Sequence, residues 1–373
     1  MQKYDIINIG DKMDSLIKYI NIYGNYSFNE IKFNEVDNIL FSLLIYLDYE
    51  GLFKNKITLE EISKLYFRKF NQNKINSFSS FHRRITKLLK EMSIKTRFKT
   101  IQIYNYKKIR ENTQFGAMCF RFNKNEIYVS YEGTDKSLIG WKEDFEISYK
   151  FPVKAQEEAI KYINEAIKKK DKIIYIGGHS KGGNLAMCAS MYAKLDIKKR
   201  INVIYNNDGP GFNIEQFNSK EWNNIQNKLI TLAPEDGIIA YLLNHQGNIK
   251  IVKSNTKSFM QHDPTSWQCF GLFFETGIRT ETSVQLENKI TKWVNNYDYT
   301  KREKFITTIF NLIETSYSKV KTTSKTSQIS TFISIIRETK KLNKKEKEFI
   351  IDVIKTLFIN KIENENNKNQ QNL

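Results

Sequence analysis

Apolar residues in the first quarter of the chain recur at the spacing of amphipathic helices. They repeat every three or four positions across residues 35–70 and again across 81–92. Thr58 and Glu61 match the capping-box start of a helix. The stretch 71–80, rich in Asn and Ser, predicts a loop between two helices. We therefore expect residues 1–95 to form a helical preface.

Short apolar runs bounded by turn residues follow, and such runs are typical of buried strands. Strands are expected over residues 101–106, 116–122, 127–131, 173–176, 201–205, 228–232 and 249–252. Helical patterns cover residues 139–149, 153–169 and the segment that follows Ser180. Because strands and helices alternate from 127 to 233, the sequence predicts a mostly parallel sheet covered on both faces, in a core spanning 96–284.

The end of the chain turns helical again. Helices are expected over residues 302–319, 329–341 and 345–360, and the last of them is amphipathic. We expect residues 285–360 to form a helical extension packed on the core. Residues 361–373 consist largely of Asn, Gln, Glu and Lys and predict a disordered tail.

One junction between a strand and a helix carries candidate chemistry. The run 173–176 leads into Gly178-His179-Ser180-Lys181-Gly182, and a small-residue helical pattern follows. This matches the G-x-S-x-G nucleophile elbow in the context that the motif requires. Glycines two residues before and after the serine remove side chains that would collide where strand and helix meet. Ser180 is therefore the candidate nucleophile.

A serine nucleophile needs a base, and the base needs an orienting acid, which in this fold occur in the chain order Ser, acid, His. The histidines are His82, His179, His245 and His262. Two lie downstream of Ser180, and His262, in a loop after the last strand, is favoured over His245. His179 is the variable elbow position, where its side chain is expected to point away from the nucleophile.

The residues alone leave the acid open. Asp208 and Asp236 each follow a strand in a loop rich in Gly and Pro, and Glu235 is a further candidate. An oxyanion also needs two donors. The backbone N–H of Lys181 is one candidate, and the turn at Gly133-Thr134 is another, although an ordinary turn accounts for it equally well.

Composition narrows the class of protein. The 373 residues have 40% hydrophobic content and a formal net charge of +18, which indicates a globular chain. Only ten of the basic residues are arginine, and no aromatic–basic motif occurs, so nucleic-acid binding is not expected. General Lys and Asn enrichment accounts for the charge most simply; the alternative is attraction to an anionic membrane surface.

Targeting and redox features point to the cell interior. No apolar run reaches 18 residues, and the start lacks the apolar segment of a signal peptide. Three cysteines without metal-ligand spacing are expected to be reduced thiols. We expect a cytoplasmic protein, in contact with the membrane only peripherally if at all.

With these residues assembled, the chain resembles a family of uncharacterised, lipase-like bacterial α/β-hydrolases that is distantly similar to class-three lipases. The resemblance covers most of residues 30–355. It is carried by Tyr131-Glu-Gly-Thr134 with Trp141 and Asp144, Gly177–Asn184, Asn207–Phe212, Pro234-Glu-Asp236-Gly, and Gln261-His262-Asp263 with Trp267.

The resemblance implies an α/β-hydrolase fold and a set of roles. Ser180 would be the nucleophile, His262 the general base and acid, and Asp236 the orienting carboxylate. Thr134 and Lys181 would hold the oxyanion. The implied chemistry is acyl transfer to water through an acyl-serine, without metal or cofactor, on an acyl ester or lipid. A thioesterase, a peptidase or a non-catalytic binding protein on the same scaffold are the alternatives.

Overall fold

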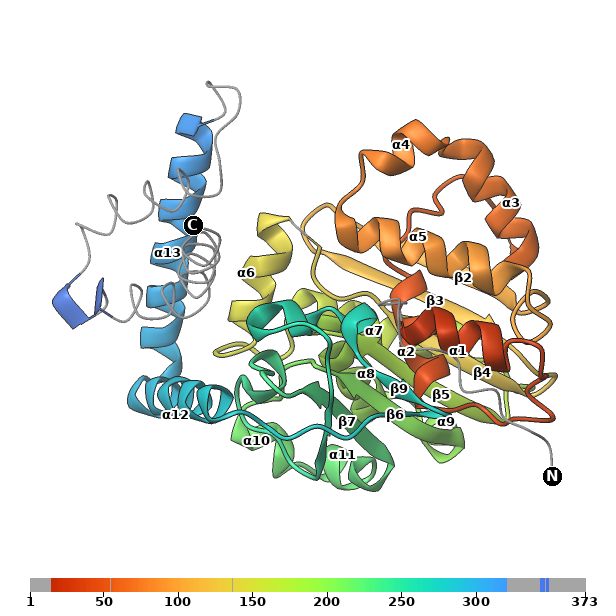
Figure 1. Ribbon diagram of the computed structural model, residues 1–373. Helices are drawn as coiled ribbons and strands as arrows, with labels where there is room; N and C mark the ends of the chain where they lie inside the picture. The colour runs from red at the N-terminus through yellow and green to blue at the C-terminus, as the bar shows by residue number, and fades with distance from the viewer. Residues whose placement is uncertain (1–14, 54, 136, 321–342, 346, 349–373) are drawn as a thin grey trace.

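The computed structural model describes residues 15–53, 55–135, 137–320, 343–345 and 347–348 (Figure 1). The expected helix over 329–341, most of that over 345–360 and the expected tail 361–373 lie outside the described residues.

An eight-stranded sheet forms the centre of the molecule, with the strands in sequence order from β1 to β8. Its strands are β1 (Lys56–Thr58), β2 (Gln102–Ile109), β3 (Phe115–Arg121), β4 (Glu126–Tyr131), β5 (Ile173–His179), β6 (Ile201–Asn207), β7 (Leu229–Pro234) and β8 (Ile249–Val252). The first four strands pair antiparallel, and β4 to β8 pair parallel. The predicted α/β-hydrolase fold with a mostly parallel sheet is confirmed.

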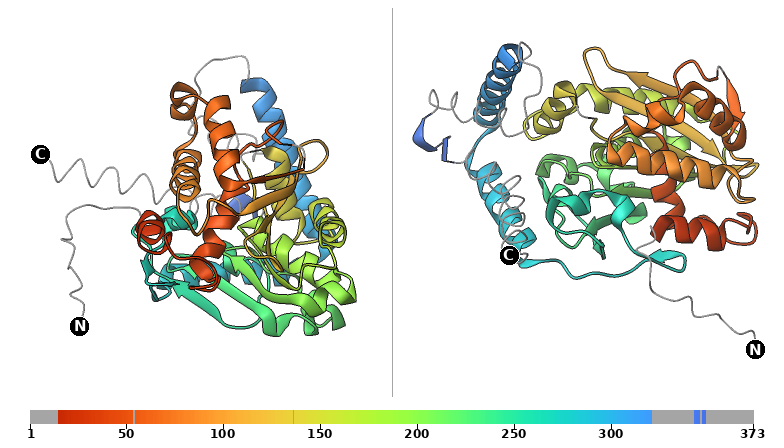
Figure 2. Two further views of the ribbon diagram at one scale, coloured as in Figure 1. Left: turned by 90° about the vertical axis from the view of Figure 1, so that its right-hand side faces the viewer. Right: turned by 45° about the horizontal axis from the view of Figure 1, so that its top comes forward.

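Helices cover both faces of this sheet (Figures 1 and 2). The α-helices are α1 (Ser15–Tyr23), α2 (Glu35–Leu44), α3 (Leu59–Lys69), α4 (Gln72–Asn76), α5 (Ser80–Ser93), α6 (Leu138–Glu146), α7 (Lys154–Ala166), α8 (Lys181–Tyr192), α9 (Leu195–Arg200), α10 (Ile214–Phe217), α11 (Lys220–Asn223), α12 (Glu281–Asn296) and α13 (Tyr299–Val320). Short 3₁₀ turns are η1 (Gln226–Lys228), η2 (Ile239–Tyr241), η3 (Ser258–His262) and η4 (Pro264–Ser266), and a small hairpin joins β9 (Cys269–Phe270) to β10 (Phe273–Phe274).

The alternation of side chains along the strands builds two separate cores. Met118 and Phe120 of β3 face the core that α1, α2, α3 and α5 complete. Ala117 and Cys119 of the same strand face the core that α7 and α8 complete. Successive side chains of a pleated strand point to opposite faces, so both faces are apolar where helices cover both. The sheet therefore packs between two helical layers.

A buried hydrogen-bond network ties α2 to the two central strands. Asn38 Nδ2 donates to Asn207 Oδ1 at 2.8 Å, and Asn207 Nδ2 donates to the Gly178 carbonyl at 3.0 Å. The Tyr128 hydroxyl donates to Asn38 Oδ1 at 2.7 Å. Because unpaired buried amides are costly, these bonds favour one position of α2 over the ends of β5 and β6.

In the N-terminal preface, one local prediction is confirmed and another is wrong in part. The predicted capping box is confirmed, since the Thr58 and Glu61 side chains each accept from the other's backbone N–H. The predicted loop over 71–80 is wrong in part, because it contains α4. The Asn71 side chain accepts a hydrogen bond from the Lys74 N–H and so starts that short helix.

Helix α13 runs beside α6, and α12 leads into it (Figures 1 and 2). Phe310 of α13 lies 5.7 Å from Phe145 of α6 between ring centroids. Arg302 of α13 is buried and donates to the Ser148 carbonyl at 2.5 Å. Among the described helices, none is long and apolar enough to cross a membrane.

Candidate active site

The elbow has the geometry that its sequence predicts. Ser180 links β5 to α8 and adopts φ 58° and ψ −132°, a conformation that a residue with a side chain rarely takes. A Cβ at Gly178 would overlap Gly182, and one at Gly182 would overlap the Tyr131 carbonyl of β4. Both glycines are therefore required for this close approach. The Ser180 side chain stays partly accessible above the strand end.

Lys181 begins α8, the helix that follows Ser180. The first N–H groups of a helix have no partner within it and lie at its positive end, so the Lys181 N–H is available to an oxyanion beside Ser180. The Lys181 side chain points elsewhere: it is buried, and its Nζ lies 2.9 Å from the Gln114 carbonyl and 3.1 Å from Glu143 Oε2. This buried ion pair anchors the residue.

The turn after β4 lies against the elbow. A Cβ on Gly133 would lie 3.1 Å from the Cβ of Ser180, which places Thr134 close to Ser180. The Thr134 hydroxyl donates to Asp144 Oδ2 at 2.5 Å. Since that hydroxyl has one proton, the donor left for an oxyanion is the Thr134 backbone N–H.

Asp144 is the unusual member of this group. Its Oδ1 is buried and has no hydrogen-bond partner among the described residues. Burial raises the pKa of Asp144 to about 6, against the opposing pull of Lys181 and the Thr134 hydrogen bond. This carboxyl group therefore changes charge near neutral pH.

His262 and Asp208 form the acid–histidine pair of the site. His262 Nδ1 lies 2.7 Å from Asp208 Oδ2, and the Asp208 side chain is 1% exposed. The Ala240 N–H donates to the other carboxylate oxygen at 3.1 Å. The pair is adjacent to the elbow, because the Ser180 N–H donates to the carbonyl of Asn207, next in the chain to Asp208, at 2.9 Å.

Asp236, which the resemblance assigned as the orienting acid, does not bond to His262. Its Oδ2 accepts from the Ser258 N–H at 2.7 Å and its Oδ1 from the Thr280 hydroxyl at 2.7 Å. The Asp236 N–H in turn donates to Gln261 Oε1 at 2.8 Å. The assignment is therefore corrected: Asp208 faces the histidine, and Asp236 organises the backbone of η3, which carries it.

The remaining candidates lie in other contacts. His245 Nε2 lies 3.8 Å from Glu287 of α12, and its ring packs edge-on against Tyr241. Glu235 Oε1 accepts from the Ile278 N–H at 3.3 Å. Of the predicted residues, the structure thus brings Ser180, Lys181, Thr134 and His262 together. Asp236 contacts Ser258 and Thr280 instead of the His262 ring.

Sequence reasoning missed the surroundings of His179. Its ring lies 4.5 Å from the His262 ring between centroids and bonds to the His262 backbone. Tyr46, just beyond α2, bonds to the other side of the same imidazole. The sequence identified His179 only as the variable elbow position, with its side chain expected to point away from Ser180. No local signal marks Tyr46, because it is 133 residues distant in sequence.

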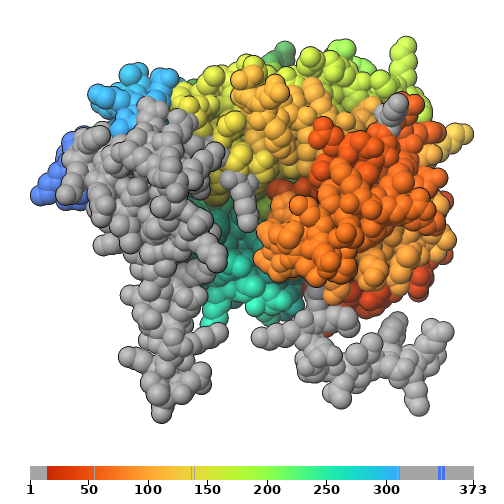
Figure 3. All heavy atoms as spheres, turned by 90° about the horizontal axis from the view of Figure 1, so that it is seen from above, coloured from red at the N-terminus to blue at the C-terminus, as the bar shows by residue number. Residues whose placement is uncertain are grey.

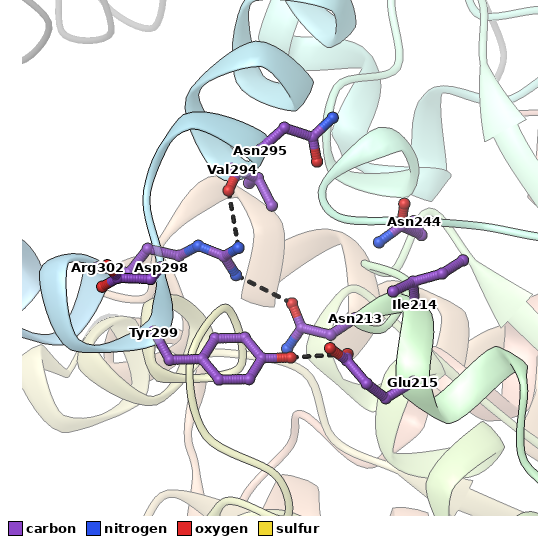
Figure 4. Close-up of a pocket in the computed structure, with 9 residues that line it drawn as sticks. All are labelled: Asn213, Ile214, Glu215, Asn244, Val294, Asn295, Asp298, Tyr299 and Arg302. Atoms are coloured by element: carbon purple, nitrogen blue, oxygen red, sulfur yellow. Dashed lines mark hydrogen bonds between the residues drawn. The ribbon is translucent and has the colours of Figure 1, made fainter.

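A cavity of about 430 Å³ lies elsewhere, between the loops after β6 and β7 and the helices α12 and α13. Figure 4 shows Arg302 pointing to Asn213 and to the Val294 carbonyl, and Tyr299 pointing to Glu215. These polar groups already satisfy one another, and the cavity contains none of the residues around Ser180.

Comparison with known proteins places the chain in a family. The profile of the Mbeg1-like family matches residues 92–311. Among solved structures, a fungal lipase–inhibitor complex is 16% identical and aligns over 40% of this chain and 67% of that one with a TM-score of 0.29. M37 lipase is 14% identical and aligns over 55% and 69% with a TM-score of 0.33. No curated protein matches. Because the family profile covers more than half of the chain, the protein belongs to the Mbeg1-like family, a lipase-like family.

Proposed function

We propose that the protein is a serine hydrolase that cleaves acyl esters through an acyl-serine intermediate. The observation that carries this proposal is the 2.7 Å contact between His262 Nδ1 and Asp208 Oδ2 beside a serine in the strained elbow conformation. The buried carboxylate accepts a hydrogen bond from the Nδ1–H of His262. Nε2 then keeps the lone pair that a general base needs.

In the first half of the reaction, Ser180 Oγ attacks the acyl carbon while His262 Nε2 takes the hydroxyl proton. The electron pair of the carbonyl moves onto its oxygen, which the N–H groups of Thr134 and Lys181 stabilise. When the tetrahedral intermediate collapses, the bond to the leaving alcohol breaks and His262 gives the alcohol its proton. The acyl group is then bonded to Ser180.

Water completes the cycle by the same route. His262 Nε2 takes a proton from the water as its oxygen attacks the acyl carbon, and the same two N–H groups hold the second oxyanion. Collapse releases the carboxylic acid and returns the proton to Ser180 Oγ. Asp208 keeps its hydrogen bond to Nδ1–H and stabilises the imidazolium that forms in each half.

The surroundings of the site favour a lipid ester. Ile139 and Trp141 of α6 are 41% and 43% exposed, and Met260 of η3 is 55% exposed. Phe259 stacks on the His262 ring with centroids 5.7 Å apart. Figure 3 shows the surface hollowed between the orange N-terminal helices, the yellow α6 region and the teal segment that follows β7. Apolar side chains at such an opening suit an acyl chain.

Peripheral contact with an anionic membrane belongs to the same proposal. The formal net charge of +18 attracts anionic phospholipid, and exposed Trp and Phe side chains favour the membrane interface. Sedimentation with anionic and with zwitterionic vesicles tests this part. We expect binding to anionic vesicles that weakens with added salt, and equal recovery with both vesicle types would contradict it.

The decisive experiment is hydrolysis of p-nitrophenyl esters of increasing chain length by wild type and Ser180→Ala. We expect turnover by wild type that the substitution abolishes, with an optimum at a medium or long acyl chain. A fluorophosphonate probe should label wild type and leave Ser180→Ala unlabelled. If wild type shows neither turnover nor labelling, the hydrolase proposal is rejected in favour of a binding protein.

A further inference from the structure

His179 holds the backbone of the residue that we propose as general base. The His179 side chain is 4% exposed, and its Nε2 lies 2.7 Å from the carbonyl oxygen of His262. A carbonyl oxygen can only accept a hydrogen bond. The proton of the His179 ring must therefore be on Nε2, so that the imidazole donates to the His262 backbone.

The other nitrogen of His179 faces the Tyr46 hydroxyl at 3.0 Å. Burial, followed by the nearby His262, holds the pKa of His179 well below its usual value, so the ring is neutral and Nδ1 accepts from Tyr46. The Tyr46 hydroxyl also packs directly against Gly133, where an added Cβ would overlap the hydroxyl oxygen, and it lies 3.4 Å from the His179 carbonyl oxygen. Tyr46 is itself buried.

These contacts form one continuous chain around the nucleophile. It runs from Gly133, which packs against the Tyr46 hydroxyl, through that hydroxyl and the His179 imidazole to the carbonyl of His262. Gly133 precedes Thr134, and the ring of His262 is bonded to Asp208. The loop that carries the oxyanion donor and the loop that carries the base are thus joined through Tyr46 and His179.

We propose that His179 and Tyr46 are positioning residues for the hydrolysis, because they join the Thr134 loop and the His262 loop in one fixed arrangement around Ser180. This inference rests on the proposed function. His262 is then held at two places, at its ring by Asp208 and at its backbone by His179. A base displaced by about 1 Å can cost on the order of 100-fold in rate.

Three substitutions test the arrangement through kinetics. His179→Phe fills the space of the ring but lacks both hydrogen bonds, and we expect kcat to fall about 10–100-fold while KM changes less than about twofold. His179→Gln has an amide that can donate to the His262 carbonyl, and it should recover most of that loss. Tyr46→Phe keeps the His179–His262 bond and should lower kcat less than His179→Phe.

His82→Gln is the matched control, because His82 bonds locally to Ser79 within the preface. We expect its kcat to equal that of wild type. Folded fractions measured by urea unfolding allow each kcat to be expressed per folded molecule. A His179→Phe variant with the wild-type kcat, or a His179→Gln variant as slow as His179→Phe, would overturn the proposal.

NMR of the imidazole nitrogens gives a readout that does not need activity. In wild type we expect His179 as the neutral Nε2–H tautomer and a low-field signal from the His262 Nδ1 proton. That signal should persist in His179→Gln and weaken in His179→Phe, and an unchanged signal in His179→Phe overturns the proposal. If wild type hydrolyses no ester, the proposed function fails, while this comparison still decides the positioning role.

Discussion

Two loops of similar composition end neighbouring strands and differ in what they do for the site. The loop after β6 contains Asp208 followed by Gly209, and the loop after β7 contains Asp236 followed by Gly237. Asp208 is fully buried, adopts a positive φ of 49° and bonds to the His262 ring. Asp236 is partly exposed and bonds to two groups that hold η3 and the start of α12.

The register of the sheet explains the difference. In the parallel pair of β5 and β6, His179 is the partner of Asn207, so Ser180 and Asp208 are each the first residue beyond adjacent strands. Strands lie about 4.8 Å apart, so Asp236, beyond β7, begins about twice as far from Ser180 as Asp208 does. An aspartate beside the elbow strand reaches the histidine ring, whereas one a strand further away holds the loop on which the histidine lies.

The largest expected effect is the loss of activity in Asp208→Asn. The buried Ala240 N–H donates to Oδ1 of Asp208, so the carbonyl of an asparagine would take that place and its NH₂ would face His262. His262 Nδ1 would then have to accept, and Nε2 would carry the proton and lose its lone pair. We expect kcat on a p-nitrophenyl ester to fall on the order of 10⁴-fold.

Asp236→Asn is the matched control for this prediction. Its carbonyl can accept from the Ser258 N–H and its NH₂ can donate to the Thr280 oxygen, so both contacts survive. We expect kcat within about threefold of wild type, since the ring of His262 keeps its partner. If Asp236→Asn proves the slower of the two, the assignment of Asp208 as orienting acid is wrong.

The contrast also shows what the sequence could and could not predict. The elbow was predictable because its glycine spacing and the apolar run before it are local consequences of a strand meeting a helix. The choice between Asp208 and Asp236 depends on which strands lie side by side and in what register, and neither loop carries that information. Tyr46 and His179 meet only because α2 packs across the ends of β5 and β6. Such contacts follow from the assembled fold rather than from neighbouring residues.

A second prediction compares the two glycines that follow these aspartates. A Cβ at Gly209 would overlap the Ser180 carbonyl and the Asn206 side chain, whereas one at Gly237 would lie 2.8 Å from the Pro234 carbonyl of its own loop. We expect Gly209→Ala to lower the free energy of unfolding by about 2–3 kcal/mol and Gly237→Ala by about 1 kcal/mol. Urea unfolding measures both values.

Gly209→Ala should also lower kcat per folded molecule, because relief of the clash must move either Ser180 or Asp208. Gly237→Ala has no such contact with the elbow and should keep the wild-type kcat. Equal losses of stability and activity in the two variants would contradict the expectation that the loop after β6 affects Ser180 more than the loop after β7 does.

A third, smaller effect concerns the role of Asp236 in stability. Asp236→Ala leaves the Ser258 N–H and the Thr280 hydroxyl without their acceptor, and we expect it to lower the free energy of unfolding by about 1–2 kcal/mol. Because η3 carries His262, kcat should fall modestly, by less than about tenfold. A large loss of activity without loss of stability would indicate that Asp236 acts on the chemistry directly.

The smallest expected effect is on the pH dependence of stability and comes from Asp144. Unlike Asp208 and Asp236, Asp144 has a carboxylate oxygen, Oδ1, with no partner among the described residues. Its pKa is raised to about 6, above the value of about 3.9 in an unfolded chain. Between these values the folded protein binds a proton that the unfolded chain does not, so this group makes stability fall as pH rises from about 4 to about 6. Above pH 6 its penalty is constant.

Asp144→Asn removes that titration, so the stability of the variant relative to wild type should increase between pH 4.5 and pH 7.5. A shift of two pKa units corresponds to about 3 kcal/mol at most, and partial exposure of Asp144 reduces the expected change to about 1 kcal/mol. The lowered pKa of His179 acts in the opposite sense below about pH 6.5, but it is common to both proteins and cancels in their difference. Urea unfolding at the two pH values measures that difference, and a value independent of pH would show that Asp144 stays ionised throughout, as a fully satisfied carboxylate would.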